Sequence, residues 1–376
     1  MSKLAEVLKE KNIAVGWLYA YIHFITEVVC FYYLTKLTND SAIIWVIPLV
    51  YDALAFVPQG LIGRFCDKFS RLNIALIGVA MLVAALIMQF GLNSNWILSI
   101  WVLCIGNCIM HVAGAECTLR NSEGKLAHSA IFVAGGSFGV ITGRLLASSI
   151  VPFWLIVLMT LTMIPFILLA NTYYKDENYK ETACLNFNYA NKKIAPFLII
   201  VLATFVVIVR GYMGYGIPTS WNKTTTQAVL LYVIMGVGKA LGGILSDCIG
   251  IRKVAVLSTV LAIPFLCFGD NIMIISLIGV MFFSMTMAIT LGILVSVLPK
   301  KPGLAFGFTT IGLFLGSAPI FFVKIIDNRI NIGLIVIISL VCTFILLKIL
   351  GKEHDKSKTL ERDDNWLWKC FLIDFI

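Results

Sequence analysis

The sequence predicts an all-α membrane protein with twelve transmembrane helices in two sets of six. Three observations lead to this fold class. The 376-residue chain is 60% hydrophobic and only 13% charged, with a mean hydropathy of +0.94, whereas a soluble domain carries about 25% charged residues. The apolar stretches can be divided into twelve segments, each near the ~20 residues that a spanning helix needs. One long polar stretch, 172–193, lies between the sixth and seventh segments.

This composition excludes a soluble enzyme and a nucleic-acid-binding domain, because twelve spans leave no length for a sizeable extramembrane domain. The net charge of +9 is interpreted as membrane topology, since basic residues collect in cytoplasmic loops. The 10 cysteines form no C-x-x-C pair and have no Cys/His ligand spacing. We therefore expect no disulfide, no bound metal and no cofactor.

The spans are apolar runs that end at loop signals such as Asn93-Ser94-Asn95 and Lys300-Lys301-Pro302. The first run is too long for a cleavable signal peptide, so it is expected to be a true span. In order along the chain, the expected spans are 13–36, 42–63, 73–92, 95–117, 126–148, 150–171, 194–217, 226–246, 253–269, 272–297, 303–323 and 331–350.

The polar stretch defines the expected domain organisation. Residues 1–171 form an N-terminal six-helix bundle, 172–193 a cytoplasmic linker, and 194–350 a C-terminal six-helix bundle. Residues 351–376 form a cytoplasmic tail whose apolar end is too short to span and could lie on the membrane surface or be dispensable.

The distribution of basic residues predicts the orientation. With the N-terminus in the cytoplasm, 22 Lys and Arg lie on the cytoplasmic side, 4 lie outside and 3 lie within spans. The positive-inside rule then places both termini in the cytoplasm, and the protein in the plasma (inner) membrane. Four tryptophans fall at the outer ends of spans, as an interfacial belt predicts: Trp45, Trp96, Trp154 and Trp221.

A short motif occurs twice, once in each set of six spans. The first copy contains Gly63, Asp67 and Arg71, and the second contains Gly243, Asp247 and Arg252. In both copies Gly precedes Asp by one helical turn and a small residue follows Asp closely, and the two aspartates are separated by half of the twelve-span unit. Glycine permits close helix approach, and aspartate can cap a helix N-terminus or pair with a basic side chain.

These two copies resemble the signature loop of the major facilitator superfamily, G-x-x-x-D-R-x-G-R-[KR]. Ser70 replaces a glycine in the first copy, and the second lacks a base directly after Asp247. The resemblance implies two bundles related by a pseudo-two-fold axis, a central substrate site that faces each side in turn, and a gate at the cytoplasmic side. It assigns this gating role to Gly63, Asp67, Arg71, Gly243, Asp247 and Arg252.

A narrower resemblance involves His23-Phe-Ile-Thr-Glu27, His111, and Val133-Ala-Gly135-Gly136-Ser-Phe-Gly139. These segments are similar to H-x-x-N-D, H-P-E and V-G-G-N-F-G of the fosmidomycin-resistance family of efflux transporters. Glu27 stands in place of Asp, Thr26 in place of Asn, and Val112-Ala113 in place of Pro-Glu.

Ionisable residues within spans are costly and tend to be functional. Glu27 and Asp52 are the two acids deep within spans, and His23 lies one helical turn before Glu27. Burial disfavours the charged carboxylate, so protonation near neutral pH could drive a conformational switch. We assign proton coupling to Glu27, Asp52 and His23. The alternative is a polar pair that only holds the first two spans together.

Further polar residues within spans are candidate substrate ligands. Arginine can bind an anionic group through two parallel hydrogen bonds, or pair with Glu27 or Asp52 as an outer gate; snorkelling toward headgroups is the alternative. The candidate set is Tyr19, Asn107, His111, Arg144, Arg210 and Tyr212. Lys239 is expected to be structural and to pair with the loop of Asp247. The glycines within 129–139 and 307–316 are expected to serve close helix packing.

Three functions are compatible with these residues. The first is proton-coupled export, by antiport, of a small amphipathic or anionic compound. The second is proton-coupled import of a metabolite such as an organic acid or sugar. The third is a membrane-embedded enzyme or sensor, disfavoured because the sequence has no nucleophile motif, phosphate loop or metal-spaced His/Glu set. The expected partners are a small-molecule substrate, protons and the lipid bilayer, without nucleic acid, and the protein is expected to act as a monomer.

Overall fold

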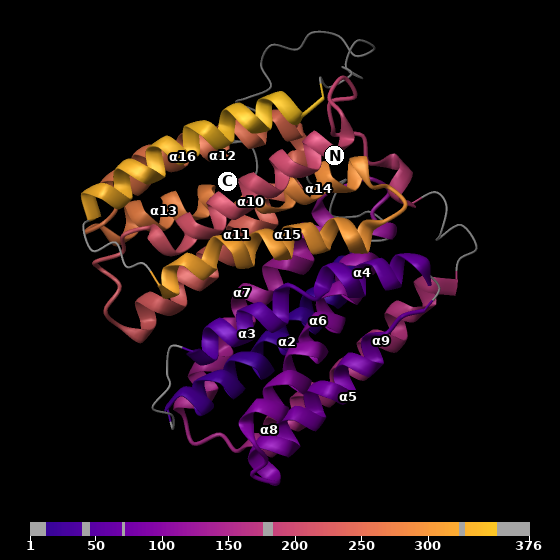
Figure 1. Cartoon of the computed structure of the whole chain (residues 1–376). Coiled ribbons are helices and arrows are strands. Elements are labelled where there is room, and N and C mark those ends of the chain that lie inside the picture. The colour runs from indigo at the N-terminus through magenta and orange to yellow at the C-terminus, as the bar shows by residue number, and fades with distance from the viewer. Residues whose placement is uncertain (1–12, 40–45, 70–71, 176–182, 323–327, 352–376) are drawn as a thin grey trace, which may run out of the picture.

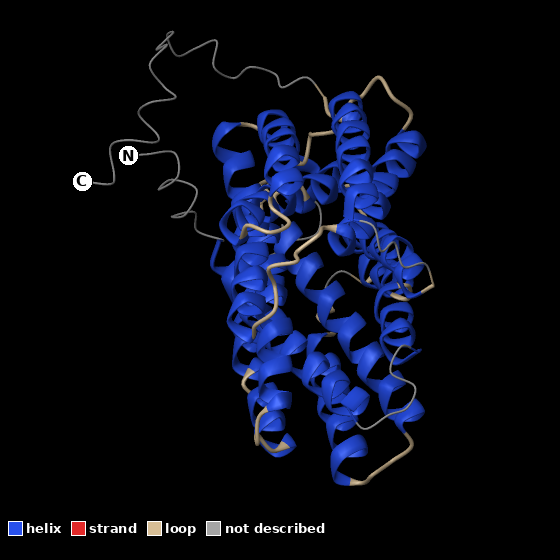
Figure 2. Ribbon diagram, turned by 90° about the vertical axis from the view of Figure 1, so that its left-hand side faces the viewer, coloured by secondary structure: helices blue, strands red, loops and turns tan. Residues whose placement is uncertain are grey.

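The computed structural model describes residues 13–39, 46–69, 72–175, 183–322 and 328–351. Within these ranges the regular structure is helical, apart from one isolated bridge between Ala190 and Leu350. Figure 2 shows the long helices running roughly side by side. The predictions for Trp45, Arg71 and the tail 352–376 lie outside the described residues.

The first half of the chain supplies six helical rods, three of which are interrupted. Their elements are α2 Ile13–Asn39, α3 Val46–Phe56 with α4 Gln59–Lys68, α5 Ala75–Leu86 with the π-helical turn Ile87–Gly91, α6 Trp96–Arg120, α7 Ala127–Ser148, and α8 Phe153–Leu161 with α9 Met163–Ala170. The break between α3 and α4 falls at Pro58, which has no N–H to donate to the preceding turn.

The second half repeats the arrangement. Its elements are α10 Pro196–Gly216, α11 Thr225–Ile249, α12 Ile251–Phe268, α13 Met273–Ser284 with α14 Met287–Val297, α15 Pro302–Ser317, and α16 Asn328–Ile349. Short 3-10 segments, Asn171–Lys175 and Ala183–Asn186, flank the undescribed part of the linker.

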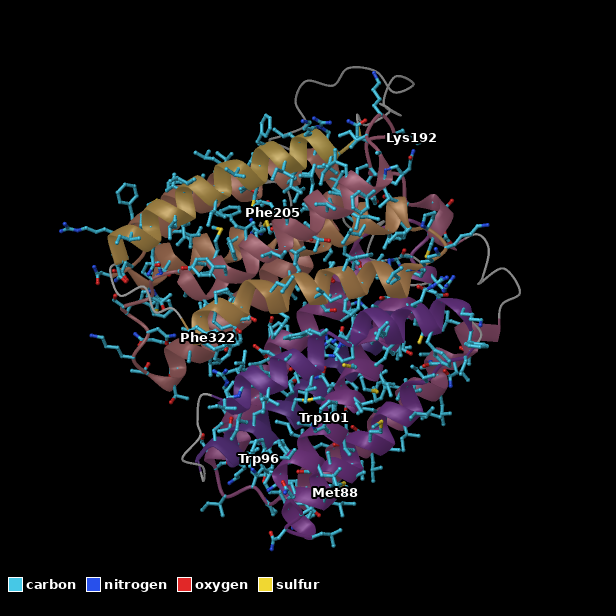
Figure 3. The ribbon with its side chains drawn as sticks, viewed as in Figure 1. Met88, Trp96, Trp101, Lys192, Phe205 and Phe322 are labelled. Carbon is cyan, nitrogen blue, oxygen red and sulfur yellow. The ribbon has the colours of Figure 1, made fainter. Side chains whose placement is uncertain are left out.

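Eleven of the described helices are long and apolar enough to cross a membrane. The remaining expected span, 73–92, is the shorter apolar helix Ala75–Gly91. Large apolar side chains such as Trp101 and Phe205 are exposed on the helix surfaces (Figure 3), as contact with lipid requires. The predicted all-α fold with twelve spans is therefore confirmed.

The helices of the first half lie on one side of the molecule and those of the second half on the other (Figure 1). Two seams join them, where α7 packs along α11 and α4 packs along α15. The two seams are equivalent under the internal repeat, since α4 and α11 each carry one copy of the motif. Both motif aspartates lie at the same end of the bundle, which we call the inner end and which is the predicted cytoplasmic end.

At the opposite end, Asp270 joins three segments of the second half. Its carboxylate accepts hydrogen bonds from the Ser220 backbone N–H at 3.0 Å, the Ser220 hydroxyl at 2.6 Å and the Asn328 amide at 2.9 Å. Burial alone would raise the pKa of Asp270, but these hydrogen bonds stabilise the ionised form and hold the pKa below its ordinary value. This loop carboxylate therefore fixes the outer ends of α10, α12 and α16.

We predict that Asp270→Asn lowers the free energy of unfolding by about 1 kcal/mol at neutral pH, because one acceptor oxygen becomes a donor. Since the folded pKa lies below the unfolded value of about 4, the stabilisation is present above that pH and is lost as the pH falls through the folded pKa. Thermal unfolding in detergent at pH 7 and pH 3.5 tests both points. If the unfolding midpoints of parent and variant differ by the same amount at both pH values, the ionic part of the prediction is contradicted.

Candidate functional site

The central feature of the first half is a buried acid between two imidazoles. The Glu27 Oε1 atom lies 3.1 Å from His111 Nε2 and 3.6 Å from His23 Nε2. The three side chains are at most about one-tenth exposed. His23 and Glu27 share a face of α2, as their spacing predicted, and α6 brings His111 to them. We call these residues the acid–imidazole cluster.

The hydrogen bonds of the two rings determine where their protons lie. His23 Nδ1 lies 2.9 Å from the Phe132 carbonyl oxygen, and His111 Nδ1 lies 3.0 Å from the Asn107 carbonyl oxygen. A carbonyl oxygen can only accept, so each Nδ1 carries a proton. In neutral rings both Nε2 lone pairs would then face the Glu27 carboxylate, which is also an acceptor. The cluster is satisfied only when a cation, most simply a proton, is shared between a ring nitrogen and the carboxylate.

Glycines of α7 make room for this arrangement. A Cβ at Gly136 would overlap the His23 ring, and one at Gly139 would approach the Glu27 Cβ within 2.7 Å. Gly135 likewise lies directly against the backbone of Ala20 on α2. These glycines do permit close packing as expected, and two of them also shape the walls of the cluster.

Further polar side chains surround the cluster. The Asn107 amide donates to the Tyr51 hydroxyl at 3.0 Å and to Cys30 Sγ at 3.2 Å, while its Oδ1 is buried without a partner. Asp52 lies within electrostatic range of Glu27 and beside Ser317 of α15. Two of the three predicted coupling residues are thus in contact, and the third lies nearby at the interface with the second half.

The ligand atoms of His23, Glu27 and His111 lie within 4.8 Å of one another, so they could close around one small cation. Sequence reasoning did not find this grouping, because His111 is far from α2 along the chain. The pattern of two imidazoles and one carboxylate appears only when α2 and α6 are packed together.

Arg144 bridges the two halves on the outer side of the cluster. Its guanidinium group lies 5.1 Å from the centroid of the Phe31 ring and 5.6 Å from that of the Tyr232 ring. Phe31 belongs to α2 and Tyr232 to α11, so the arginine is placed between aromatic walls from opposite halves. Its exposed side chain is suitably placed to meet an anionic ligand.

The other predicted ligands have more local surroundings. Arg210 stacks on the Phe283 ring at 4.1 Å and donates to the Phe283 carbonyl, which keeps it within the second half. Its Nη1 is buried without a hydrogen-bond partner. The backbone of Tyr212 packs against Gly316. The fully buried Tyr19 accepts a hydrogen bond from Asn73, one turn away from the cluster.

Asp67 fastens the first seam at the inner end. Its two carboxylate oxygens accept hydrogen bonds from the Gly303 and Leu304 backbone N–H groups at 2.8 and 2.9 Å, at the N-terminus of α15. Gly63 lies one turn earlier, and a Cβ there would overlap the Gly303 backbone. A negative charge is favoured at a helix N-terminus, so this contact holds the two halves together.

Asp247 fastens the second seam in the same way. Its oxygens accept from the Leu126 and Ala127 N–H groups at 2.9 and 2.8 Å, at the N-terminus of α7. Gly243 packs directly on Ala130.

Both aspartates lie in the last turn of a helix rather than in the loop that the sequence predicted. The reason is that α4 continues to Lys68 and α11 to Ile249. Each aspartate therefore caps a helix of the opposite half, not the helix that follows it.

Other basic residues near the inner end act within one half. Arg120 pairs with Glu116 at 2.9 Å and approaches Asp67 at 3.8 Å. Arg252, a predicted gating residue, donates to carbonyls within 347–351, so it ties α12 to the end of α16. Among the described residues, the hydrogen-bond partners of Arg252 belong to the second half.

The structure gives Lys239 a different partner from the expected Asp247 loop. Its ammonium group donates to the Ser137 hydroxyl on α7 at 2.8 Å. Superposing Asp67 on Asp247 aligns Gln59 with Lys239, but helix periodicity alone could not show which side chain the lysine faces.

No protein-family model matches the chain, and no curated protein sequence matches it. Solved structures do match in fold. A variant of the E. coli fucose:proton symporter FucP is 15% identical, with a TM-score of 0.56, over 90% of this chain and 98% of that chain.

Two further structures show the same likeness. The human organic anion transporter MFSD10 (TETRAN) is 10% identical, with a TM-score of 0.58, over 90% of this chain and 100% of that chain. A bacterial homologue of the iron transporter ferroportin, in an outward-facing state, is 12% identical, with a TM-score of 0.53, over 89% and 98%. All three are transport proteins rather than enzymes. The chain therefore has the fold of major facilitator superfamily transporters.

We predict that Gly136→Ala destabilises the protein, because its Cβ would displace the His23 ring from the cluster. Overpacking of this kind costs about 1–3 kcal/mol. Gly214→Ala is the matched control, since nothing lies within 4 Å of a Cβ there. Thermal unfolding in detergent should show a lower midpoint for Gly136→Ala only; equal midpoints for the two variants would show that the ring does not need this space.

We also predict that Asp67→Asn and Asp247→Asn each loosen both seams at the inner end. Loss of a charge at a helix N-terminus costs about 1 kcal/mol, and the halves are expected to move as bodies. Hydrogen exchange followed by mass spectrometry should show faster exchange in the segments around Gly303 and Leu126 in both variants. Faster exchange confined to the segment each aspartate caps would contradict a shared gate.

Proposed function

We propose that the chain is a secondary active transporter of the plasma membrane that works by alternating access and exports a small amphipathic or anionic compound in exchange for protons. The observation that carries this proposal is the acid–imidazole cluster, which requires a shared cation, most simply a proton, where two rings and a carboxylate converge. In a low-dielectric bundle such a group takes up or releases a proton when its surroundings change.

The two seams supply the conformational element. Hydrogen bonds at Asp67, Asp247, Ser137 and Thr310 cross between spans of the two halves, and they lie from the middle of the bundle to the inner end. This distribution supports a state closed at the predicted cytoplasmic side. Breaking the aspartate contacts would open that side, as alternating access requires.

The substrate class follows from Arg144 and its aromatic neighbours. A cation between Phe31 and Tyr232 suits a compound with an anionic group and an apolar body. Asp52 and Arg210 complete the proposed site, with Arg210 reaching it only after a rearrangement. The same proposal includes three further points. The chain resembles the fosmidomycin-resistance efflux family, it acts as a monomer, and both of its termini lie in the cytoplasm.

Import of a small metabolite with protons is the alternative, and it uses the same residues. The two directions differ in the sign of coupling: in antiport substrate and proton move oppositely, and in symport they move together. A proteoliposome assay of proton movement on addition of each member of a compound panel separates them. A panel of organic anions that causes no proton movement would contradict both.

We predict that Glu27→Gln abolishes substrate-driven proton movement while substrate binding and exchange persist. The amide mimics the protonated acid, so the cluster no longer needs or releases the shared proton. Proton flux in liposomes checks this, with Asp270→Asn as the control acid far from the cluster. If Glu27→Gln moves protons like the parent, the carrier is elsewhere, and Asp52 is the next candidate.

A further inference from the structure

Lys239 of the second half lies beside the acid–imidazole cluster of the first half. Its Nζ donates to the Ser137 hydroxyl at 2.8 Å, and Ser137 is buried on α7. The preceding residue, Gly136, is the one against which the His23 ring packs. Glu27 lies within electrostatic range of the lysine. One half thus places a basic side chain within electrostatic range of the central acid of the other.

Close packing on both sides fixes Lys239 in the seam between α7 and α11. A Cβ at Gly236, one turn before the lysine, would lie 2.8 Å from the Phe138 ring. One turn after it, Gly243 lies directly on Ala130. The two helices are therefore in contact one turn before and one turn after Lys239, which holds the lysine backbone in the seam.

The equivalent seam shows that packing does not require this charge. When the two motifs are superposed, Gln59 of α4 occupies the position of Lys239. Its amide donates to the Ala55 carbonyl of α3, within the same half, at 2.7 Å. That seam keeps the same aspartate contact and the same glycine packing, at Gly63 and Gly303, with a neutral side chain. At this position a charge is present only in the seam that borders the acid–imidazole cluster.

We propose that Lys239 links the protonation of Glu27 to the movement of the two halves. With Glu27 ionised, the opposite charges hold α11 against α7 in the state closed at the inner end. Once Glu27 is protonated, the ammonium group is left in the seam without its counter-charge, which is unfavourable in a low-dielectric interior. The seam then separates more readily.

Other titratable groups act on the same carboxylate. His23 of α2 and His111 of α6 face it directly, and Asp52 of α3 lies within its electrostatic range. On the side of the lysine, α7 contributes the neutral Ser137. The imidazoles therefore share the proton with Glu27, whereas Lys239 responds to the charge that results.

Lys239 is a positioning residue that acts through Glu27, and the inference rests on the proposed function. Lys239→Gln tests it, because it introduces the side chain that the equivalent seam already holds and is thus expected to fold. Substrate-driven proton flux in liposomes should fall about tenfold, while substrate exchange stays within about twofold. Lys239→Arg, which keeps the charge, should retain most of the flux.

Two further variants separate the charge from other roles. Ser137→Ala removes the hydrogen bond but leaves the charge, so it should have little effect. In a Glu27→Gln background the proton flux is already lost, so hydrogen exchange of the α7 segment that contains Ser137 is measured instead. Lys239→Gln should slow this exchange, because it removes the ammonium group that has no counter-charge. A Ser137→Ala variant that matches Lys239→Gln, or a double variant that exchanges no more slowly than Glu27→Gln, would overturn the proposal.

A second measurement does not depend on transport. Hydrogen exchange of the α7 segment that contains Ser137, corrected for intrinsic rates, should increase in the parent as the pH is lowered and the cluster takes up its proton. In Lys239→Gln this pH dependence should be absent. If the parent shows this pH dependence of hydrogen exchange but moves no protons when substrate is added, the proposed function is rejected and the linkage is kept. Equal pH dependence in parent and variant, or loss of substrate binding in the variant, would reject the linkage itself.

Discussion

The buried Glu27 carboxylate faces two imidazole rings, and the Nδ1–H group of each ring already donates to a backbone carbonyl. This arrangement constrains the residues packed around it. The Phe132 and Asn107 carbonyls fix both rings, so the Nε2 atoms can only turn toward Glu27. Acceptors on all three sides require a shared cation. The glycines of α7 are then necessary, because a Cβ at Gly136 would displace the His23 ring.

The two seams connect this local chemistry to the arrangement of the two halves. Each seam pairs a glycine contact with an aspartate that caps a helix of the other half, and neither contact would survive a rotation of the halves. The stabilisation is modest for each aspartate, about 1 kcal/mol, so the closed state is easily opened by a change elsewhere. A balance of this size is compatible with the two states that the proposed alternating access requires.

The two seams differ in charge at one equivalent position. Gln59 and Lys239 occupy equivalent positions, yet only the lysine carries a charge. The glycines and aspartates account for packing and closure in both seams, whereas the ammonium group introduces a dependence of one seam on the charge of the cluster. The two halves therefore share an architecture but not an electrostatic role.

Composition and apolar length alone establish the fold class and the spans, because a backbone in lipid must satisfy its own hydrogen bonds within helices. The repeated motif likewise located Asp67 and Asp247, and helical spacing placed His23 with Glu27 on one face. Three contacts could be found only in the folded molecule: His111 joins Glu27, Lys239 faces Ser137, and Arg210 stacks on Phe283. Helical periodicity specifies which side chains share a face, but the neighbour of that face depends on how helices far apart in the chain pack together.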